Sequence, residues 1–304
     1  MLTIFLAIAP VFVLILMGYG LRRGGIPSTE FWNLNDRLVY WVLMPALFFA
    51  KISAADLSGG LGDYAVLLYA GFLAAIFCGW LLGRGIAPPQ ASSLMQGSAR
   101  FNTFVGLAIA EALYGAPGLQ IAVLGSALLV PGVNVAVVML MTRQLGGGGK
   151  SVVFGLVRNP LILSICAGAL FNLAGMGEVP VLHEIARILG DAALPIMLLC
   201  VGANLKLRGL GGSRRTIGLA MIGKFVINPA AIVLAALILA PDPLVAQIAL
   251  IFAALPTGVA AYTLAREMQG DAPLMAAIIT TQTLVSFVTL PVTLLIGRAL
   301  LSGG

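Results

Sequence analysis

The sequence contains few charged residues. Only 9% of its 304 residues are Asp, Glu, Lys or Arg, whereas 60% are hydrophobic and the mean hydropathy is +1.07. A soluble domain carries about 25% charged residues. The shortage of charge therefore excludes a soluble globular domain and indicates a chain that crosses a lipid bilayer several times. Because Lys and Arg in membrane proteins mainly set orientation, the net charge of +6 is no sign of a nucleic-acid partner.

Histidine and cysteine are also scarce. His183 is the single histidine and lies beside Glu184, and Cys78, Cys166 and Cys200 lack the spacing of a metal site or a disulfide pair. A metal centre and a Ser–His nucleophile are therefore excluded, and a Ser–Lys pair that uses Lys224 is the one catalytic arrangement left open. We expect no enzyme activity, no metal and no cofactor.

Long apolar runs fill the rest of the chain. Polar or Gly/Pro-rich breaks divide it into ten segments of about 20 residues or more, each long enough to span a bilayer as a helix. The sequence therefore predicts an all-α polytopic membrane protein. The expected segments are 3–22, 32–54, 63–85, 90–113, 117–142, 151–174, 180–205, 215–240, 244–268 and 272–300.

Positive charge is distributed unevenly between the loops. Eleven Lys or Arg residues fall in or beside the loops after odd-numbered segments, against Lys51, Arg187 and Arg298 for the even-numbered loops. Cytoplasmic loops carry the excess of positive charge. The bias predicts a multi-pass protein of the inner (cytoplasmic) membrane with both termini outside and the Gly-rich linker 146–150 in the cytoplasm.

The two halves of the chain resemble each other weakly. A shift of 150 places Pro10 on Pro160 and Pro45 on Pro195. Each half holds five segments, and an odd number implies that the second half is inserted upside down, as in many secondary transporters. The predicted organisation is a first five-helix repeat over 1–145, the linker over 146–150 and an inverted five-helix repeat over 151–304.

The fourth and ninth segments contain helix-breaking residues near their middles. "ARFNTF" holds Asn102 and Thr103, and "ALPTGV" holds Pro256, Thr257 and Gly258. Freed backbone groups must face protein or a wet cavity, and helix N-termini that meet at one point form an anion site. We expect all five residues to bind substrate there. The alternative is an ordinary kink, with polar side chains that bond a neighbouring helix.

Three stretches carry a family resemblance that extends over the whole chain. "RFNTFVGLAIAEALYG", "LPIMLLCVGANL" and "LPTGVAAYTLARE" resemble the auxin efflux carrier family. The resemblance implies a bile acid/sodium symporter-like fold, in which broken helices four and nine cross at the substrate site. It also implies an elevator mechanism, with scaffold helices 1, 2, 6 and 7 that often dimerise and transport-domain helices 3–5 and 8–10. Plant members have a proline beside the helix-four Asn, which is missing beside Asn102.

Arg100 is the most specific candidate site residue. A guanidinium near the bilayer midplane is costly, and it matches a carboxylate with two parallel hydrogen bonds. Arg100 therefore either recognises an anionic substrate or pairs with a buried acid such as Asp191 or Glu111. The remaining polar candidates on the fifth and tenth segments, Asn134, Gln282 and Ser286, either line the cavity or join helices.

Two further charged residues lie inside apolar segments. Lys224 is either an internal cation tied to Asp191 or to the site, or a side chain that snorkels to the membrane surface. Asp191 has no base beside it in sequence, so it either carries a coupling proton or lies nearer the cytoplasmic end of its segment. Transport driven by the membrane potential alone stays open.

The leading hypothesis is a secondary transporter that holds a small organic anion at the crossing of the broken helices. The family resemblance suggests a carboxylate such as malonate, or an auxin-like acid, and a homodimer in the lipid bilayer. A membrane sensor or scaffold of the same fold without transport is the alternative. Such a protein has no need for two matched helix breaks.

Overall fold

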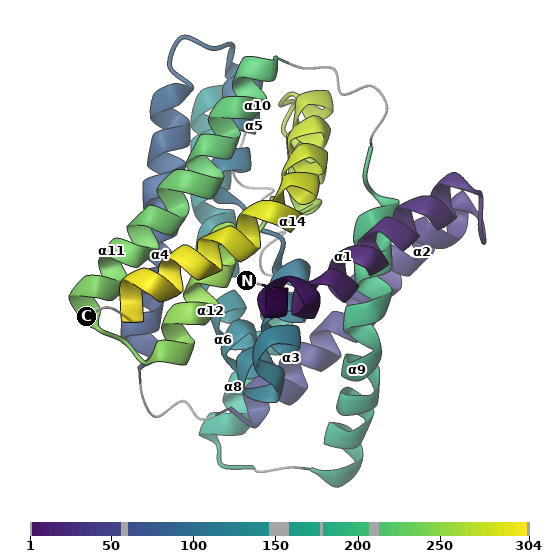
Figure 1. The fold of residues 1–304 in the computed structure, drawn as a ribbon. Helices are drawn as coiled ribbons and strands as arrows, with labels where there is room; N and C mark the ends of the chain where they lie inside the picture. The colour runs from purple at the N-terminus through teal and green to yellow at the C-terminus, as the bar shows by residue number, and fades with distance from the viewer. Residues whose placement is uncertain (1, 56–59, 146–157, 177–178, 207–212, 303–304) are drawn as a thin grey trace.

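All regular structure among the described residues is helical. The computed structural model describes residues 2–55, 60–145, 158–176, 179–206 and 213–302, and within these ranges it contains no strand (Figure 1). Six helical runs are long and apolar enough to cross a membrane, and α8 and α12 are shorter apolar helices. The expected class, an all-α polytopic membrane protein, is confirmed at this level.

Helices begin and end at the breaks seen in the sequence, and four of them begin with proline, whose missing N–H costs nothing at that position. In chain order they are α1 (Leu2–Arg23), α2 (Thr29–Leu38), the π-helical turn η1 (Val39–Leu43), α3 (Met44–Ser53), α4 (Leu61–Leu82), α5 (Pro88–Ala99), α6 (Thr103–Leu145), α8 (Pro160–Leu173), α9 (Pro180–Ala203), α10 (Arg214–Ile222), the π-helical turn η2 (Gly223–Ile227), α11 (Asn228–Leu239), α12 (Pro243–Ala254), α13 (Ala260–Glu267) and α14 (Ala272–Ser302).

Two of the expected segments continue through a π-helical turn. The run from α2 to α3 passes through η1, and the run from α10 to α11 passes through η2. α6 bends sharply at Gly115, whose φ of 62° and ψ of −152° favour glycine. The bend separates the stretch before Gly115 from the expected segment 117–142. The predicted linker 146–150 lies outside the described residues.

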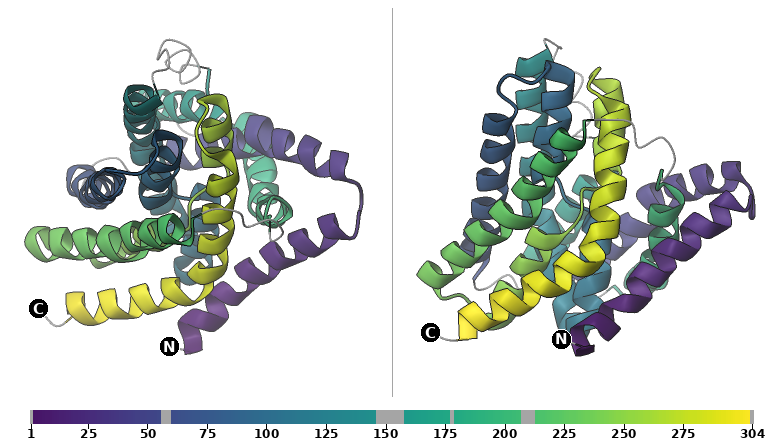
Figure 2. Two further views of the ribbon diagram at one scale, coloured as in Figure 1. Left: turned by 90° about the horizontal axis from the view of Figure 1, so that it is seen from above. Right: turned by 45° about the horizontal axis from the view of Figure 1, so that its top comes forward.

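The helices gather into two groups. α1 packs on α9, and α3 packs on both α8 and α9, whereas α4 packs on α5 and α11. Figures 1 and 2 place α1, α2 and α9 on one side of the molecule and α4, α10 and α11 on the other. α6 contacts helices of both groups, and α12 packs on α6, α4 and α11. The interruptions between α5 and α6 and between α12 and α13 are therefore central in the fold.

Glycines allow α1 and α9 to touch backbone to backbone. A Cβ placed at Gly202 would collide with the carbonyl oxygen of Ile15, and one placed at Gly18 would collide with the carbonyl oxygen of Leu199. Small residues at helix contacts are the usual way in which membrane helices gain close packing. The α1–α9 contact is therefore closed to any larger side chain.

Candidate functional site

Two interrupted helices meet near the middle of the molecule. α5 ends at Ala99 and α6 begins at Thr103, and between them Arg100 has an extended backbone, with φ −69° and ψ 154°. α12 ends at Ala254 and is followed by residues 255–259 before α13. The backbone N–H of Asn102 donates to the carbonyl oxygen of Pro256 at 2.8 Å. The two interruptions are thus in direct backbone contact.

Glycine at position 258 makes this close approach possible. A Cβ at Gly258 would lie 2.8 Å from the carbonyl oxygen of Phe101 and 3.3 Å from the Cα of Asn102. Both neighbours are backbone atoms and cannot rotate away. Gly258 therefore allows two backbone segments of the chain to approach each other. A helix kink alone would not require this packing role.

Thr257 joins the two interruptions through its side chain. Its hydroxyl lies 2.8 Å from Oε1 of Gln282, 3.1 Å from the carbonyl oxygen of Gly97 and 3.3 Å from that of Arg100. Its backbone N–H donates to Oε1 of Gln282 at 2.9 Å, and Nε2 of Gln282 donates to the Gly97 carbonyl oxygen at 2.8 Å. Both side chains are fully buried. This closed network holds α5, the 255–259 segment and α14 together.

Asn102 caps the N-terminus of α6 and leaves its side-chain amide nitrogen without a hydrogen-bond partner. Its Oδ1 accepts from the backbone N–H groups of Phe104 at 3.2 Å and Val105 at 3.3 Å, which is an N-cap arrangement. Its amide nitrogen Nδ2 is buried and has no hydrogen-bond partner. The side chain therefore caps the helix with its oxygen and leaves its amide N–H groups unpaired. Thr103 is half-buried.

Arg100 is also incompletely paired. The side chain is 9% exposed, and Nη2 donates to Oδ1 of Asn134 at 3.0 Å, whereas Nη1 is buried without a partner. The expected alternative of a buried acid is wrong, because Glu111 is exposed and Asp191 lies 3.6 Å from Arg187. Asn134 is neutral, so the positive charge of Arg100 stays uncompensated by this contact.

Lys224 is a second buried cation. It lies in η2, is fully buried, and its Nζ has no hydrogen-bond partner. No Asp or Glu appears among the buried residues that the structure describes. The expected tie between Lys224 and Asp191 does not occur, and snorkelling is equally excluded by the complete burial. Lys224 and Arg100 are therefore two buried basic side chains with no buried carboxylate in the described ranges.

Asp191 lies on the surface of α9. Its side chain is 63% exposed, and its carboxylate is 3.6 Å from Nη1 of Arg187, one helical turn earlier. The premise that Asp191 lacks a nearby base is therefore wrong, because residues four apart share a helix face. A carboxylate paired in this way does not belong to the interruption site. Ser286 is buried, but its hydroxyl donates to the Thr283 carbonyl oxygen of its own helix at 2.8 Å.

Two polar residues at the site escaped the sequence reasoning. Gln96 is fully buried with both side-chain amide atoms unpaired, and Oδ1 of Asn228 is buried and unpaired. Asn228 also lines a cavity of about 10 Å³ with Phe101, roughly the space of one water molecule. Spacing offered a signal, because Gln96 precedes Arg100 by four residues and Asn228 follows Lys224 by four.

The arrangement suits the binding of an anion better than catalysis. At the interruptions it offers unpaired N–H groups on Arg100 and Asn102, and the N-termini of α6 and α13 add partial positive charge. The described residues include no group of three or more His, Cys, Asp or Glu side chains that could hold a metal ion. These groups can bind and orient a negatively charged ligand.

Comparison with known proteins gives a consistent result. A model of the family described as membrane transport protein matches residues 3–294. An uncharacterized transporter of Methanothermobacter thermautotrophicus is 27% identical over 290 residues, which cover 92% of this chain and 94% of that protein. A candidate malonate transporter of Rhizobium meliloti is 28% identical over 283 residues, which cover 86% of this chain and 85% of that protein.

The family match covers nearly the whole chain, including both interrupted helices. It confirms the resemblance to the auxin efflux carriers, and the names of the relatives point to a transporter rather than an enzyme. The chain belongs to the membrane transport protein family, and it is a membrane transporter.

Proposed function

We propose that this protein is a secondary transporter that moves a small organic anion across the cytoplasmic membrane, with the substrate held where the two interrupted helices meet. The observation that carries the proposal is the pair of buried, unpartnered donors at this point, Nη1 of Arg100 and Nδ2 of Asn102. A buried donor without a partner costs about 1–3 kcal/mol, and more when it is charged. A carboxylate bound here would accept from both groups and remove that cost.

Charge supports the same assignment. Arg100 meets only the neutral Asn134, and Lys224 meets no partner, so an anion would compensate charge that the protein leaves open. The N-termini of α6 and α13 add the partial positive charge of a helix end. Thr257, Gln282, Pro256 and Gly258 hold the two interruptions in contact. In this proposal they shape the site, and Arg100 and Asn102 contact the substrate.

The substrate class follows from these donors and from the relatives. A small carboxylate such as malonate fits a site that combines a guanidinium with an amide donor. The similarity to a candidate malonate transporter of Rhizobium meliloti supports this class. An auxin-like acid is the second type of substrate to test. Lys224 contributes a supporting positive charge in either case.

The packing supports an elevator mechanism within a ten-helix inverted repeat. α1, the α2–α3 run, α8 and α9 pack among themselves and would form the scaffold, which pairs as a homodimer. α4 to α6 and α10 to α14 would form the moving body, because they carry both interruptions. In this proposal, residues 1–145 and 151–304 are the two repeats, and both termini face outward.

Ligand-dependent stability of the purified protein tests the proposal. A ligand that binds only the native state raises the melting temperature, by an amount equivalent to about 2.7 kcal/mol at a concentration 100 times its Kd. We expect malonate or indole acetate to stabilise the wild-type protein, and the matching amides to leave it unchanged. Arg298→Gln is the matched control, because the Arg298 guanidinium already bonds Gln247 and the Tyr114 hydroxyl.

Two outcomes would overturn the proposal. Equal stabilisation by acids and by their amides would remove the anion site, and a response to acids that survives Arg100→Gln would remove Arg100 from it. Uptake of the stabilising acid into liposomes that contain the protein then separates transport from a sensor of the same fold, which would bind the acid without flux.

A further inference from the structure

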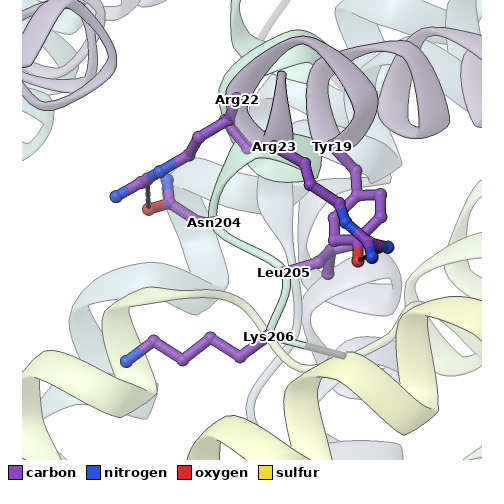
Figure 3. A pocket seen from close by; sticks show the side chains of 7 residues that line it. Tyr19, Arg22, Arg23, Asn204, Leu205 and Lys206 are labelled. Carbon is purple, nitrogen blue, oxygen red and sulfur yellow. Dashed lines mark hydrogen bonds between the residues drawn. The ribbon is translucent and has the colours of Figure 1, made fainter. Parts of the chain in front are cut away.

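We propose that a pocket at the ends of α1 and α9 binds the phosphate group of an anionic membrane lipid. The pocket has a volume of about 220 Å³ and is lined by Tyr19, Arg22, Arg23, Asn204 and Lys206, among others (Figure 3). Three of these five side chains are cationic, and no carboxylate lines the pocket. The pocket is separate from the interrupted helices, and it does not depend on the transported substrate.

The cationic side chains are positioned by neutral partners. Nη1 of Arg22 donates to Oδ1 of Asn204 at 3.2 Å, and Nη1 of Arg23 donates to the Tyr19 hydroxyl at 3.3 Å. Each contact uses one of the several N–H groups of a guanidinium, so the others remain for a ligand. Figure 3 shows Arg22 and Lys206 extending to the same side of the pocket.

One carboxylate lies near the pocket but is already engaged. Oδ2 of Asp36 accepts from Nδ2 of Asn204 at 2.8 Å, and Asp36 offsets part of the charge of Arg22. Arg23 and Lys206 stay without a carboxylate partner among the described residues. The ammonium group of Lys206 lies 4.2 Å above the Tyr262 ring instead. The pocket therefore keeps a net positive charge that matches a phosphate.

The position along α1 favours a lipid over a free phosphate. Arg22 and Arg23 form the last turn of a helix that is long and apolar enough to span the bilayer, so they lie at headgroup depth. Leu16 and Met17, one to two turns earlier, are 53% and 46% exposed. Leu16 lies seven residues before Arg23, on the same face of α1, and offers apolar surface for an acyl chain below that side of the pocket. Basic pockets between membrane helices bind anionic headgroups in the same manner.

A lipid in this pocket would connect the two helix groups. Arg22 and Arg23 belong to α1, whereas Lys206 follows α9 and its backbone N–H donates to the Thr280 hydroxyl of α14 at 3.1 Å. Its side chain also contacts Tyr262 of α13. A phosphate held by Arg22 and Lys206 would tie α1 to the elements around α13 and α14, so bound lipid stabilises the arrangement described here.

Lipid-dependent stability of the full-length protein tests the inference. The purified protein is melted in detergent with added phosphatidylglycerol, with added phosphatidylcholine, or with inorganic phosphate alone. We expect phosphatidylglycerol to raise the melting temperature, and phosphatidylcholine and inorganic phosphate to have little effect. The double variant Arg22→Gln/Lys206→Gln should weaken the phosphatidylglycerol response by about 10- to 30-fold in concentration, given about one kcal/mol for each cationic contact.

Arg37→Gln is the matched control, because Arg37 is an exposed arginine on the same predicted membrane face and does not line the pocket. Its response to phosphatidylglycerol should equal that of the wild-type protein. Arg23→Gln provides a second pocket variant should the double variant fail to fold. An equal loss in the control and the pocket variants, or equal effects of the two lipids, overturns the inference. Full stabilisation by inorganic phosphate alone keeps the anion site but overturns the lipid as its ligand.

Discussion

Both interruptions break a helix with a short non-helical segment, but they differ in whether their polar side chains have hydrogen-bond partners. The polar side-chain groups of Thr257 and Gln282 all have partners, and Gly258 packs against the backbone of the other interruption. Around Arg100 and Asn102 two buried N–H groups have none. Because unpaired buried donors are costly, a satisfied region maintains the fold while an unsatisfied one is available for a ligand. The comparison predicts that stability and binding depend on opposite sides of the crossing.

The largest loss of stability is expected from Gly258→Val. The new side chain would press on the carbonyl oxygen of Phe101, which is backbone and cannot move aside. Overpacking of this kind costs about 3 kcal/mol. The melting temperature of the purified variant measures it. Gly218→Val is the control, because a Cβ at Gly218 meets nothing within 4 Å, and equal losses in both would contradict the close approach.

A smaller loss is expected from Thr257→Val, which removes the hydroxyl at nearly constant volume. Gln282 and the Gly97 carbonyl oxygen would lose a buried partner, at a cost of about 2 kcal/mol. Thermal melting measures the loss, and Thr289→Val is the control, since the Thr289 hydroxyl bonds only the Val285 carbonyl oxygen of its own helix at 3.3 Å. A loss of stability no greater than that of Thr289→Val would contradict the inference that Thr257 joins the two interruptions.

Two substitutions of Asn102 distinguish its capping role from its proposed binding role. Asn102→Ala removes both the cap and the free donor, so it should cost about 1 kcal/mol of stability and abolish carboxylate binding. Asn102→Asp keeps a capping oxygen and adds a negative charge that is favourable at a helix N-terminus, so it should melt near the wild-type temperature yet fail to bind the acid. Melting with and without ligand checks both variants, and normal binding by Asn102→Asp would remove Nδ2 from the site.

The smallest stability effect is expected from Arg100→Gln. This change removes an uncompensated buried charge, so the free energy of unfolding should change by about zero. Carboxylate affinity, by contrast, should fall by at least about tenfold, since hydrogen bonds to charged groups contribute about 1.5–3 kcal/mol. A titration of melting temperature against malonate measures both. A clearly destabilised Arg100→Gln protein would mean that Arg100 is structural.

The residues from which the sequence predicts helix breaks act locally. Pro256 and Gly258 weaken a helix wherever they stand, and Asn102 has the chemistry of a cap. Which polar groups find hydrogen-bond partners depends on residues that are distant in the sequence, and a local sequence pattern does not predict those partners. Arg100 meets Asn134 across 34 positions, and Thr257 meets Gln282 across 25. These partners follow from packing, which no local pattern contains.

The expectation that Asp191 has no base nearby is wrong for a different reason. Arg187 precedes it by four residues, and a pair with this spacing lies on one helix face, so the signal was present in the sequence. Residues next to Asp191 in the chain, by contrast, do not face it on the helix. Gln96 escaped in the same way, although it precedes Arg100 by one helical turn.

The glycine contact between α1 and α9 also limits how this sequence can vary. At Gly18 and Gly202 the neighbouring backbone occupies the volume that any side chain would need. Most lipid-facing positions of the same helices accept one apolar residue for another at little cost. A saturation library of α1 and α9 would therefore show two narrow positions of intolerance in otherwise permissive helices.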